Sequence, residues 1–169
     1  MKRIVTHHRK ALLVFAALLC AAAGARAESP HFVGKVTATL TSDDNALVCW
    51  KEAGLDDNLL INNTASADSA STFVCVNGGG QCPNAANKTT VSGPVSATGA
   101  FSSGKNGNIV ACLTISPPGP GLFACPPGQT LTRSDVSFSN LRDSDDTDGI
   151  SATASPSAFS ATLFTCPGP

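Results

Sequence analysis

Six cysteines carry the most definite chemistry in this sequence, and all of them lie beyond residue 27: Cys49, Cys75, Cys82, Cys112, Cys125 and Cys166. An even number of cysteines in an exported chain predicts a framework of three disulfides. Zinc binding is the alternative, but this part of the chain has no Cys-x-x-Cys pair and His31 is its only histidine. We therefore expect oxidised cysteines and no reactive thiol.

The pairing of these cysteines is not fixed by their number. Two pairs enclose segments rich in Gly and Pro, residues 76–81 and 113–124, which favours short local bridges. Local pairing gives Cys75–Cys82, Cys112–Cys125 and Cys49–Cys166. An alternative scheme instead joins Cys75 to Cys125 across the domain.

Four aspartates lie close together near the C-terminus: Asp143, Asp145, Asp146 and Asp148. Calcium prefers several carboxylate oxygens on one tight loop, so these residues are candidate calcium ligands. The EF-hand pattern fits them poorly, because Ser155 stands where that loop needs a glutamate. The alternative is an acidic hairpin tip, which would discourage pairing between sheets of different molecules.

Catalytic chemistry has little support in the residue pattern. A serine hydrolase needs an imidazole base and a nucleophile elbow, but Gly-x-Ser-x-Gly is absent and His31 lies close to the start of the exported chain. Paired acids at residues 43–44 and 56–57 could in principle hydrolyse a glycosidic bond, although adjacent acids in turns are usually solvated turn formers. We expect no catalytic residue and no cofactor, with a hydrolase that uses paired carboxylates as the alternative.

Residues 1–27 have the pattern of an export signal. A basic start is followed by an apolar run over residues 11–23 and by Ala25-Arg26-Ala27, the small-residue pattern of a cleavage site. The run is too short to cross a bilayer, so we expect no membrane insertion. All twelve acidic residues follow position 27, whereas several of the eleven basic ones precede it, so the exported part is acidic. An acidic domain excludes nucleic-acid binding through a basic face.

Residues 28–169 are predicted to form one all-β domain. Val36, Ala38 and Leu40 alternate with threonines, and Ser and Thr are frequent throughout, which is typical of strands and turns. The predicted strands are 36–41, 46–50, 59–65, 72–76, 89–101, 109–115, 129–141 and 150–164, the last interrupted by Pro156. Pro94 makes the fifth segment an edge strand or two short strands. About eight such strands indicate an antiparallel β-sandwich.

Residues 48–55, with Trp50 on an alternating strand, resemble the tryptophan-bearing strand of fibronectin type III and other immunoglobulin-like domains. The whole exported chain resembles small secreted bacterial proteins of unassigned function, through residues 50–55, 65–68, 85–88, 103–107 and 125–129. This resemblance implies an immunoglobulin-like β-sandwich and an extracellular or periplasmic location. It implies no reaction.

These observations favour an exported, monomeric, non-catalytic module that binds a protein or a cell-surface component through loops at one end of the sandwich. The alternatives are the hydrolase described above and a passive structural protein of the cell envelope. We expect Trp50 to belong to the core and not to a sugar-binding platform.

Overall fold

The computed structural model describes residues 29–82 and 87–167, and its regular elements there are strands and short 3-10 turns such as η2 (Gly104–Asn106). The predicted all-β class is thus confirmed. The predicted export signal and the first two residues of the family-like stretch at 85–88 lie outside the described residues. Within the part of the chain that is described, no helix is long and apolar enough to span a membrane.

The described residues form nine strands: β1 (His31–Phe32), β2 (Val36–Leu40), β3 (Ala46–Ala53), β4 (Leu60–Asn77), β5 (Lys88–Ser102), β6 (Ile109–Ile115), β7 (Gln129–Asp145), β8 (Ile150–Ser155) and β9 (Phe159–Thr162). Most of them match predicted strands within a few residues. The two strands predicted at 59–65 and 72–76 are parts of the single strand β4, and the last predicted strand is divided around Pro156 into β8 and β9.

The strands form one continuous sheet in the order β1-β3-β2-β8-β7-β4-β5, with β6 added beside β3 and β9 beside β7. The prediction of a purely antiparallel arrangement is wrong, because β2 and β8 pair in parallel through Val36–Ala154 and Thr37–Ser155. This short parallel contact has a structural role. It joins the antiparallel group β1, β2, β3 and β6 to the antiparallel group β4, β5, β7, β8 and β9.

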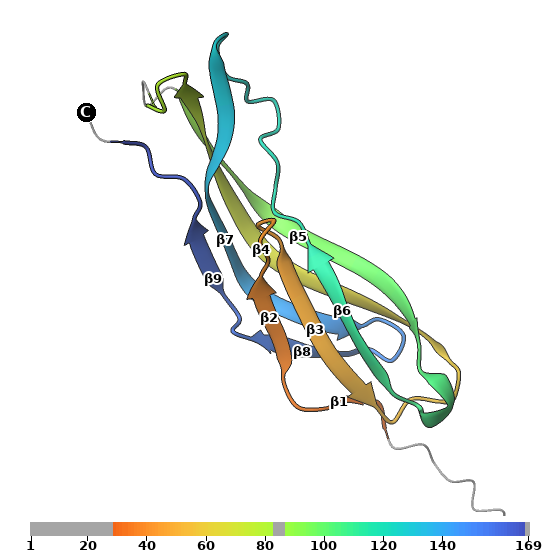
Figure 1. Cartoon of the computed structure of the whole chain (residues 1–169). Helices are drawn as coiled ribbons and strands as arrows, with labels where there is room; N and C mark the ends of the chain where they lie inside the picture. Colours follow the sequence, from red (N-terminus) through yellow and green to blue (C-terminus); the bar gives the residue numbers. More distant parts are fainter. Residues whose placement is uncertain (1–28, 83–86, 168–169) are drawn as a thin grey trace, which may run out of the picture.

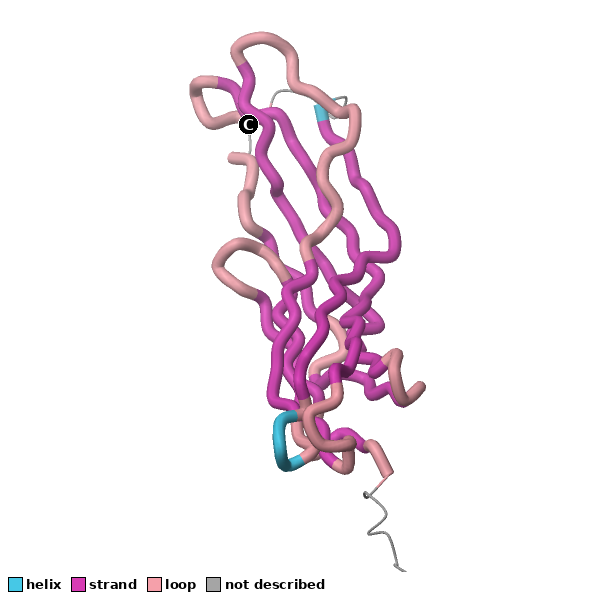
Figure 2. Tube along the Cα trace, turned by 90° about the vertical axis from the view of Figure 1, so that its right-hand side faces the viewer, coloured by secondary structure: helices cyan, strands magenta, loops and turns pink. Residues whose placement is uncertain are grey.

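The two groups of strands face each other as layers, with β2, β3 and β6 in front of β4, β5 and β7 in Figure 1 and the elongated shape visible from the side in Figure 2. The core lies between the layers and includes Val48, Trp50, Val136, Phe138 and Leu141, each at most 3% exposed. Trp50 meets the ring of Phe101 edge to face at 5.4 Å. Trp50 therefore belongs to the core, as expected, and each large apolar side chain buried here contributes about 1.5–3 kcal/mol.

Strand β5 is an edge strand, as Pro94 predicted, and it remains continuous through that proline. It pairs with β4 along its whole length, from Val74–Lys88 to Leu60–Ser102. Its sequence from Thr89 to Ser102 contains no charged residue. The edge therefore depends on Pro94, which lacks a backbone N–H, to limit pairing with other chains.

The three disulfides join Cys49 to Cys112, Cys75 to Cys125 and Cys82 to Cys166. The favoured local pairing is wrong in all three bridges, whereas the alternative Cys75–Cys125 bridge is present. Cys49 and Cys112 face each other in register on β3 and β6. Each disulfide connects segments at least 50 residues apart in the sequence, so the bridges restrain the whole domain and not single turns.

Candidate functional site

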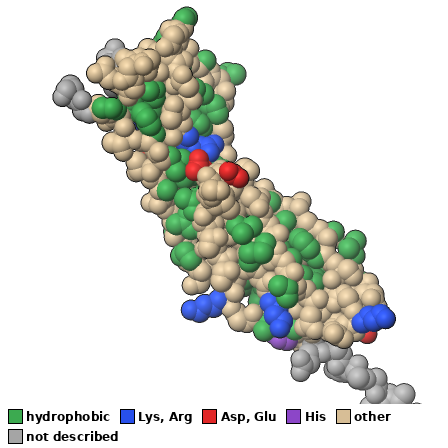
Figure 3. Space-filling view, viewed as in Figure 1, with side chains coloured by type: hydrophobic (Ala, Val, Ile, Leu, Met, Phe, Trp, Pro, Cys, Tyr) green, Lys and Arg blue, Asp and Glu red, His purple; other side chains and the backbone are tan. Residues whose placement is uncertain are grey.

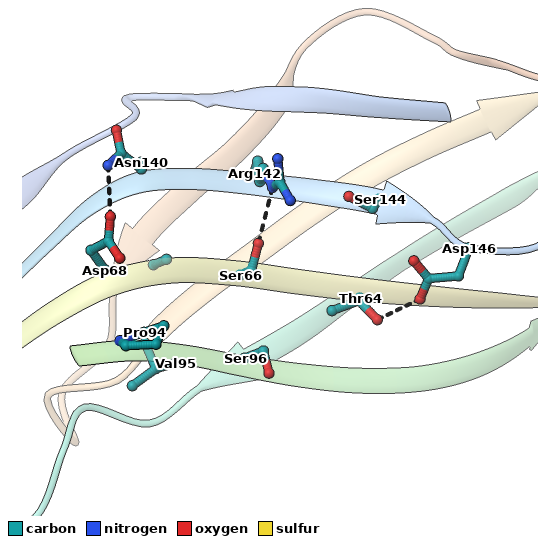
Figure 4. Close-up of a pocket in the computed structure, with 11 residues that line it drawn as sticks. Thr64, Ser66, Asp68, Pro94, Val95, Ser96, Asn140, Arg142, Ser144 and Asp146 are labelled. Carbon is teal, nitrogen blue, oxygen red and sulfur yellow. Dashed lines mark hydrogen bonds between the residues drawn. The ribbon is translucent and has the colours of Figure 1, made fainter. Parts of the chain in front are cut away.

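The outer face of strands β4, β5 and β7 is hollowed into a groove of about 650 Å³ (Figure 4). Most of the residues that line it have polar side chains, and they come from all three strands and the turn after β7: Thr64, Ser66, Ala67, Asp68, Pro94, Val95, Ser96, Asn140, Arg142, Ser144 and Asp146. Because residues of a strand alternate between the two faces of a sheet, the polar side chains of this set point away from the core, whereas Ala67 and Val95 lie on the core side.

A β-bulge in β7 shapes this groove. The register between β4 and β7 shifts between Ser66 and Asp68, where β7 has one extra residue, and Asn140 there adopts a φ of +54°. Asparagine tolerates this left-handed conformation better than most residues. Because a bulge bends its strand and increases the local twist, the sheet curves at this point.

Three hydrogen bonds cross the groove between β4 and β7 or the turn that follows β7 (Figure 4). Asn140 Nδ2 donates to Asp68 Oδ2 at 2.7 Å, Arg142 Nε donates to Ser66 Oγ at 3.2 Å, and the Thr64 hydroxyl donates to Asp146 Oδ2 at 2.6 Å. No imidazole of the described residues lies beside these hydroxyls, since the histidine of this part of the chain, His31, lies on β1. The groove can therefore form hydrogen bonds with a polar ligand, but its residues form no nucleophile and base pair.

A second cluster, of buried acids, lies between the two layers, where β3 faces the inner side of β4 and β7. Glu52 on β3 and Asp143 on β7 are 0% exposed, and Asp145 is 1% exposed. Asn63 on β4 lies between the first two and donates from Nδ2 to Glu52 Oε1 at 3.2 Å, to Glu52 Oε2 at 3.3 Å and to Asp143 Oδ2 at 3.3 Å. Asn63 thus links the two layers at the end of the molecule opposite Cys75 and Cys125.

Burial raises the pKa of Glu52 from its ordinary value of 4.5 to about 7, against the opposing hydrogen bond from Asn63 and with a further contribution from the charge of Asp145. Burial also raises the pKa of Asp143 from 3.8 to about 7, and the neighbouring charge of Glu52 adds to this effect. The pKa of Asp148, in the turn after β7, is raised by desolvation and by Asp145. Low-dielectric surroundings and like charges both favour the neutral acid.

The candidate calcium ligands do not converge on one loop. Asp143 and Asp145 point into the core, whereas Asp146 lies on the outer face and Asp148 is exposed in the β7–β8 turn. Asp145 Oδ1 instead accepts hydrogen bonds from the backbone N–H groups of Thr147 and Asp148, at 2.8 and 3.0 Å. Among the described residues, no group of three His, Cys, Asp or Glu side chains is placed to hold a metal ion.

The adjacent acids considered for hydrolysis are also in separate places. In the β2–β3 turn, Oδ2 of Asp44 lies 3.7 Å from Nη1 of Arg133 on β7. Asp56 and Asp57 are exposed in the loop after β3. The sequence interpretation missed Glu52 and Asn63. Strand alternation could have identified both, because Glu52 continues the inward series of Val48 and Trp50, and Asn63 lies between Ile61 and Ala65 on the inward face of β4.

The end of the molecule opposite the buried acids holds two disulfides and several segments without regular secondary structure. Cys75–Cys125 and Cys82–Cys166 join the end of β4, the 116–128 connection and the C-terminal segment. The 116–128 connection contains no charged residue, and its Leu122 is fully exposed, at 104% of the reference area. A shallow hollow of about 410 Å³ lies beside Cys82–Cys166, between Lys88, Asp135 and Phe164. We call this part of the molecule the disulfide end.

The chain matches no known family model, no curated protein and no solved structure.

Proposed function

We propose that the protein is an exported, non-catalytic binding module, and that its disulfide end recognises a protein at or near a cell surface. The observation that carries this proposal is the exposure of Leu122 on an uncharged loop that is tied to the core by Cys75–Cys125. Exposed apolar side chains on a surface depleted of charge are typical of the centre of protein interfaces.

The covalent restraint supports the same proposal. A loop held by a bridge loses little conformational entropy when it binds, so more of the contact energy is expressed as affinity. In Figure 3 the upper end of the molecule shows hydrophobic side chains and no charged ones on the visible face. Three disulfides are typical of an oxidising compartment, which supports export to the periplasm or the extracellular space.

The hydrolase alternative receives less support from the geometry. The two acids whose pKa is raised to about 7, Glu52 and Asp143, are fully buried between the layers and do not line the groove. A general acid must reach the bond that it protonates. The best candidates for acid catalysis are therefore held where no substrate contacts them.

The immunoglobulin-like fold is also a proposal. Two facing layers and a buried Trp50 on β3 support it. The bridge beside this tryptophan departs from that pattern, because Cys49–Cys112 joins neighbouring strands of one layer and not the two layers.

The test is retention of a partner by the oxidised domain, with Leu122→Asp as the variant and Val110→Asp as the matched control. Val110 is 79% exposed on β6, away from the disulfide end. We expect immobilised wild type and Val110→Asp to retain the same partner from the secreted and surface proteins of the source organism. Leu122→Asp should bind it at least about tenfold more weakly, as expected for a central interface residue. Equal retention by both variants would contradict the proposal, and the absence of any partner would favour a passive structural protein.

A further inference from the structure

The buried acids between the layers have too few hydrogen-bond donors to be ionised together. Asn63 Nδ2 carries two hydrogens, yet three carboxyl oxygens of Glu52 and Asp143 surround it. Asp143 Oδ1 and Asp145 Oδ2 are buried and have no partner. A buried carboxylate oxygen without a donor is costly, and two neighbouring carboxylates in this state are more so.

The charges around this cluster make ionisation more unfavourable still. The charged groups that act most strongly on Glu52 are Asp145 at the end of β7 and Asp148 in the following turn. Those that act most strongly on Asp143 are Glu52, Asp145 and Asp146, while Asp56 from the loop after β3 acts on Asp148. All of these groups are acidic. The neighbours of Glu52 in the sheet, Phe32 on β1 and Ile109 on β6, are apolar.

Such a cluster can be stabilised either by a cation or by protons. A cation requires at least three ligands around one point, and in the described residues no three acidic, histidine or cysteine side chains are so placed. The orientation of Asn63 also disfavours a cation at this point, because Asn63 directs its N–H groups and not its oxygen towards the carboxyl groups.

We propose that Glu52, Asp143 and Asn63 form a proton-controlled clamp between the two layers of the protein. With protons on the carboxyl groups, hydrogen bonds through Asn63 hold β3 against β4 and β7. When the protons leave, two unpaired negative charges face each other in the core and this end of the molecule loosens. The clamp is independent of the disulfide end and of what that end binds.

The direction of the pH effect follows from proton linkage. In the unfolded chain both carboxyl groups ionise near their ordinary values of 4.5 and 3.8, whereas in the folded protein they keep their protons up to about pH 7. Between these limits the folded state binds more protons than the unfolded state, so stability falls as pH rises. The contribution is complete below about pH 4 and is lost above about pH 7.

The experiment measures the folding equilibrium constant by urea denaturation of the oxidised protein from pH 5 to pH 8.5. Between pH 5 and 7, the folding equilibrium constant of the wild type should fall about tenfold per pH unit for each proton that the folded state binds and the unfolded state does not. Glu52→Gln and Asp143→Asn should each reduce this slope and raise stability at pH 8, because each removes a buried charge. Asp68→Asn is the matched control, since Asp68 lies on the outer face of β4, accepts a hydrogen bond from Asn140 and is not among the charges that act on Glu52 or Asp143; it should leave the slope unchanged.

Three outcomes would overturn the proposal. The first is a wild-type slope near zero from pH 5 to 7, and the second is a slope that survives both core substitutions. The third is a calcium-dependent rise in wild-type stability at pH 8 that Glu52→Gln abolishes, which would identify a cation clamp. If a core variant does not fold, the infrared band of protonated carboxyl groups decides the question in the wild type. The band should persist at pH 6 and disappear by pH 8.5, and its absence at pH 6 would contradict the clamp.

Discussion

Gly107 occupies a position that a residue with a side chain cannot take without rearrangement. It follows η2 with a φ of +59°, and a Cβ atom added there would collide with the carbonyl oxygen of Leu55. The backbone N–H of Leu55 donates to the carbonyl oxygen of Gly107 at 3.1 Å, so the two segments cannot separate without losing this bond.

We expect Gly107→Ala to destabilise the protein by more than about 1 kcal/mol, since both the backbone conformation and the close contact oppose it. Thermal or urea denaturation measures the change. Gly93→Ala on β5 is the control, because Gly93 has no positive φ and no atom within 4 Å of an added Cβ. A Gly107→Ala protein as stable as the Gly93→Ala protein would show that the loop after β3 adapts at little cost.

Single residues also show how far the sequence predicts the site. The strand pattern that predicted 46–50 would, if extended by two residues, have placed Glu52 beside Trp50 in the core. The observed strand runs to Ala53, with Glu52 fully buried. In the sequence alone, an acidic residue such as Glu52 predicts that a buried strand ends before it. Only the hydrogen bonds from Asn63 of β4, which connect Glu52 of β3 with Asp143 of β7, show why this acid is tolerated in the core.

At the scale of elements, β7 changes its inward phase at Asn140. Ser134, Val136 and Phe138 face the core before the bulge, whereas Leu141 and Asp143 face it afterwards. A strict alternation from Phe138 onwards would bring Asn140 and Arg142 into the core. The bulge therefore keeps Arg142 in the outer groove and sends Asp143 to Asn63.

We expect Asn140→Val to cost about 1–2 kcal/mol more than Asn140→Gly, because a β-branched residue is strained at a φ of +54° and glycine is not. Both variants lose the bond to Asp68, so their difference isolates the backbone effect. Denaturant unfolding of both proteins checks this, with Ser139→Val, an exposed neighbour on β7, as the control for adding valine. If the valine and glycine variants are equally stable, the bulge does not need the left-handed residue.

Element boundaries could be predicted where turn residues separate strands, but not along β4. Residues 66–71, Ser-Ala-Asp-Ser-Ala-Ser, have small side chains that are common in loops, so two strands were expected. In the structure Ala67, Ser69 and Ser71 alternate inward and are buried. The long partners β5 and β7 hold this weak segment in the sheet, and such non-local pairing leaves no clear local pattern.

At the scale of the whole molecule, the disulfide pairing was the least predictable feature. Spacing along the chain favoured short bridges, whereas the fold brings together cysteines that are 50 to 84 residues apart. Cys75 lies near the end of β4, opposite Leu131 of β7. The 116–128 connection returns to that same end, which places Cys125 beside Cys75. Pairing thus depends on topology and not on spacing.

We expect replacement of both Cys49 and Cys112 by alanine to lower the free energy of unfolding by about 4 kcal/mol, the chain-entropy value for a closed loop of this length. The bridge spans 63 residues and joins β3 to β6 beside the core. Urea denaturation of the oxidised double variant and of the wild type gives the difference. A loss under about 1 kcal/mol would mean that strand pairing alone already fixes β6 against β3.

The uncharged free edge of β5 has a consequence for the behaviour of the protein at high concentration. A long strand without charged residues is a template on which neighbouring molecules could assemble into fibrils. Pro94, in the middle of this strand, interrupts the row of donors that such growth requires. The solubility of the protein therefore depends on the proline ring at this one position of the β5 edge.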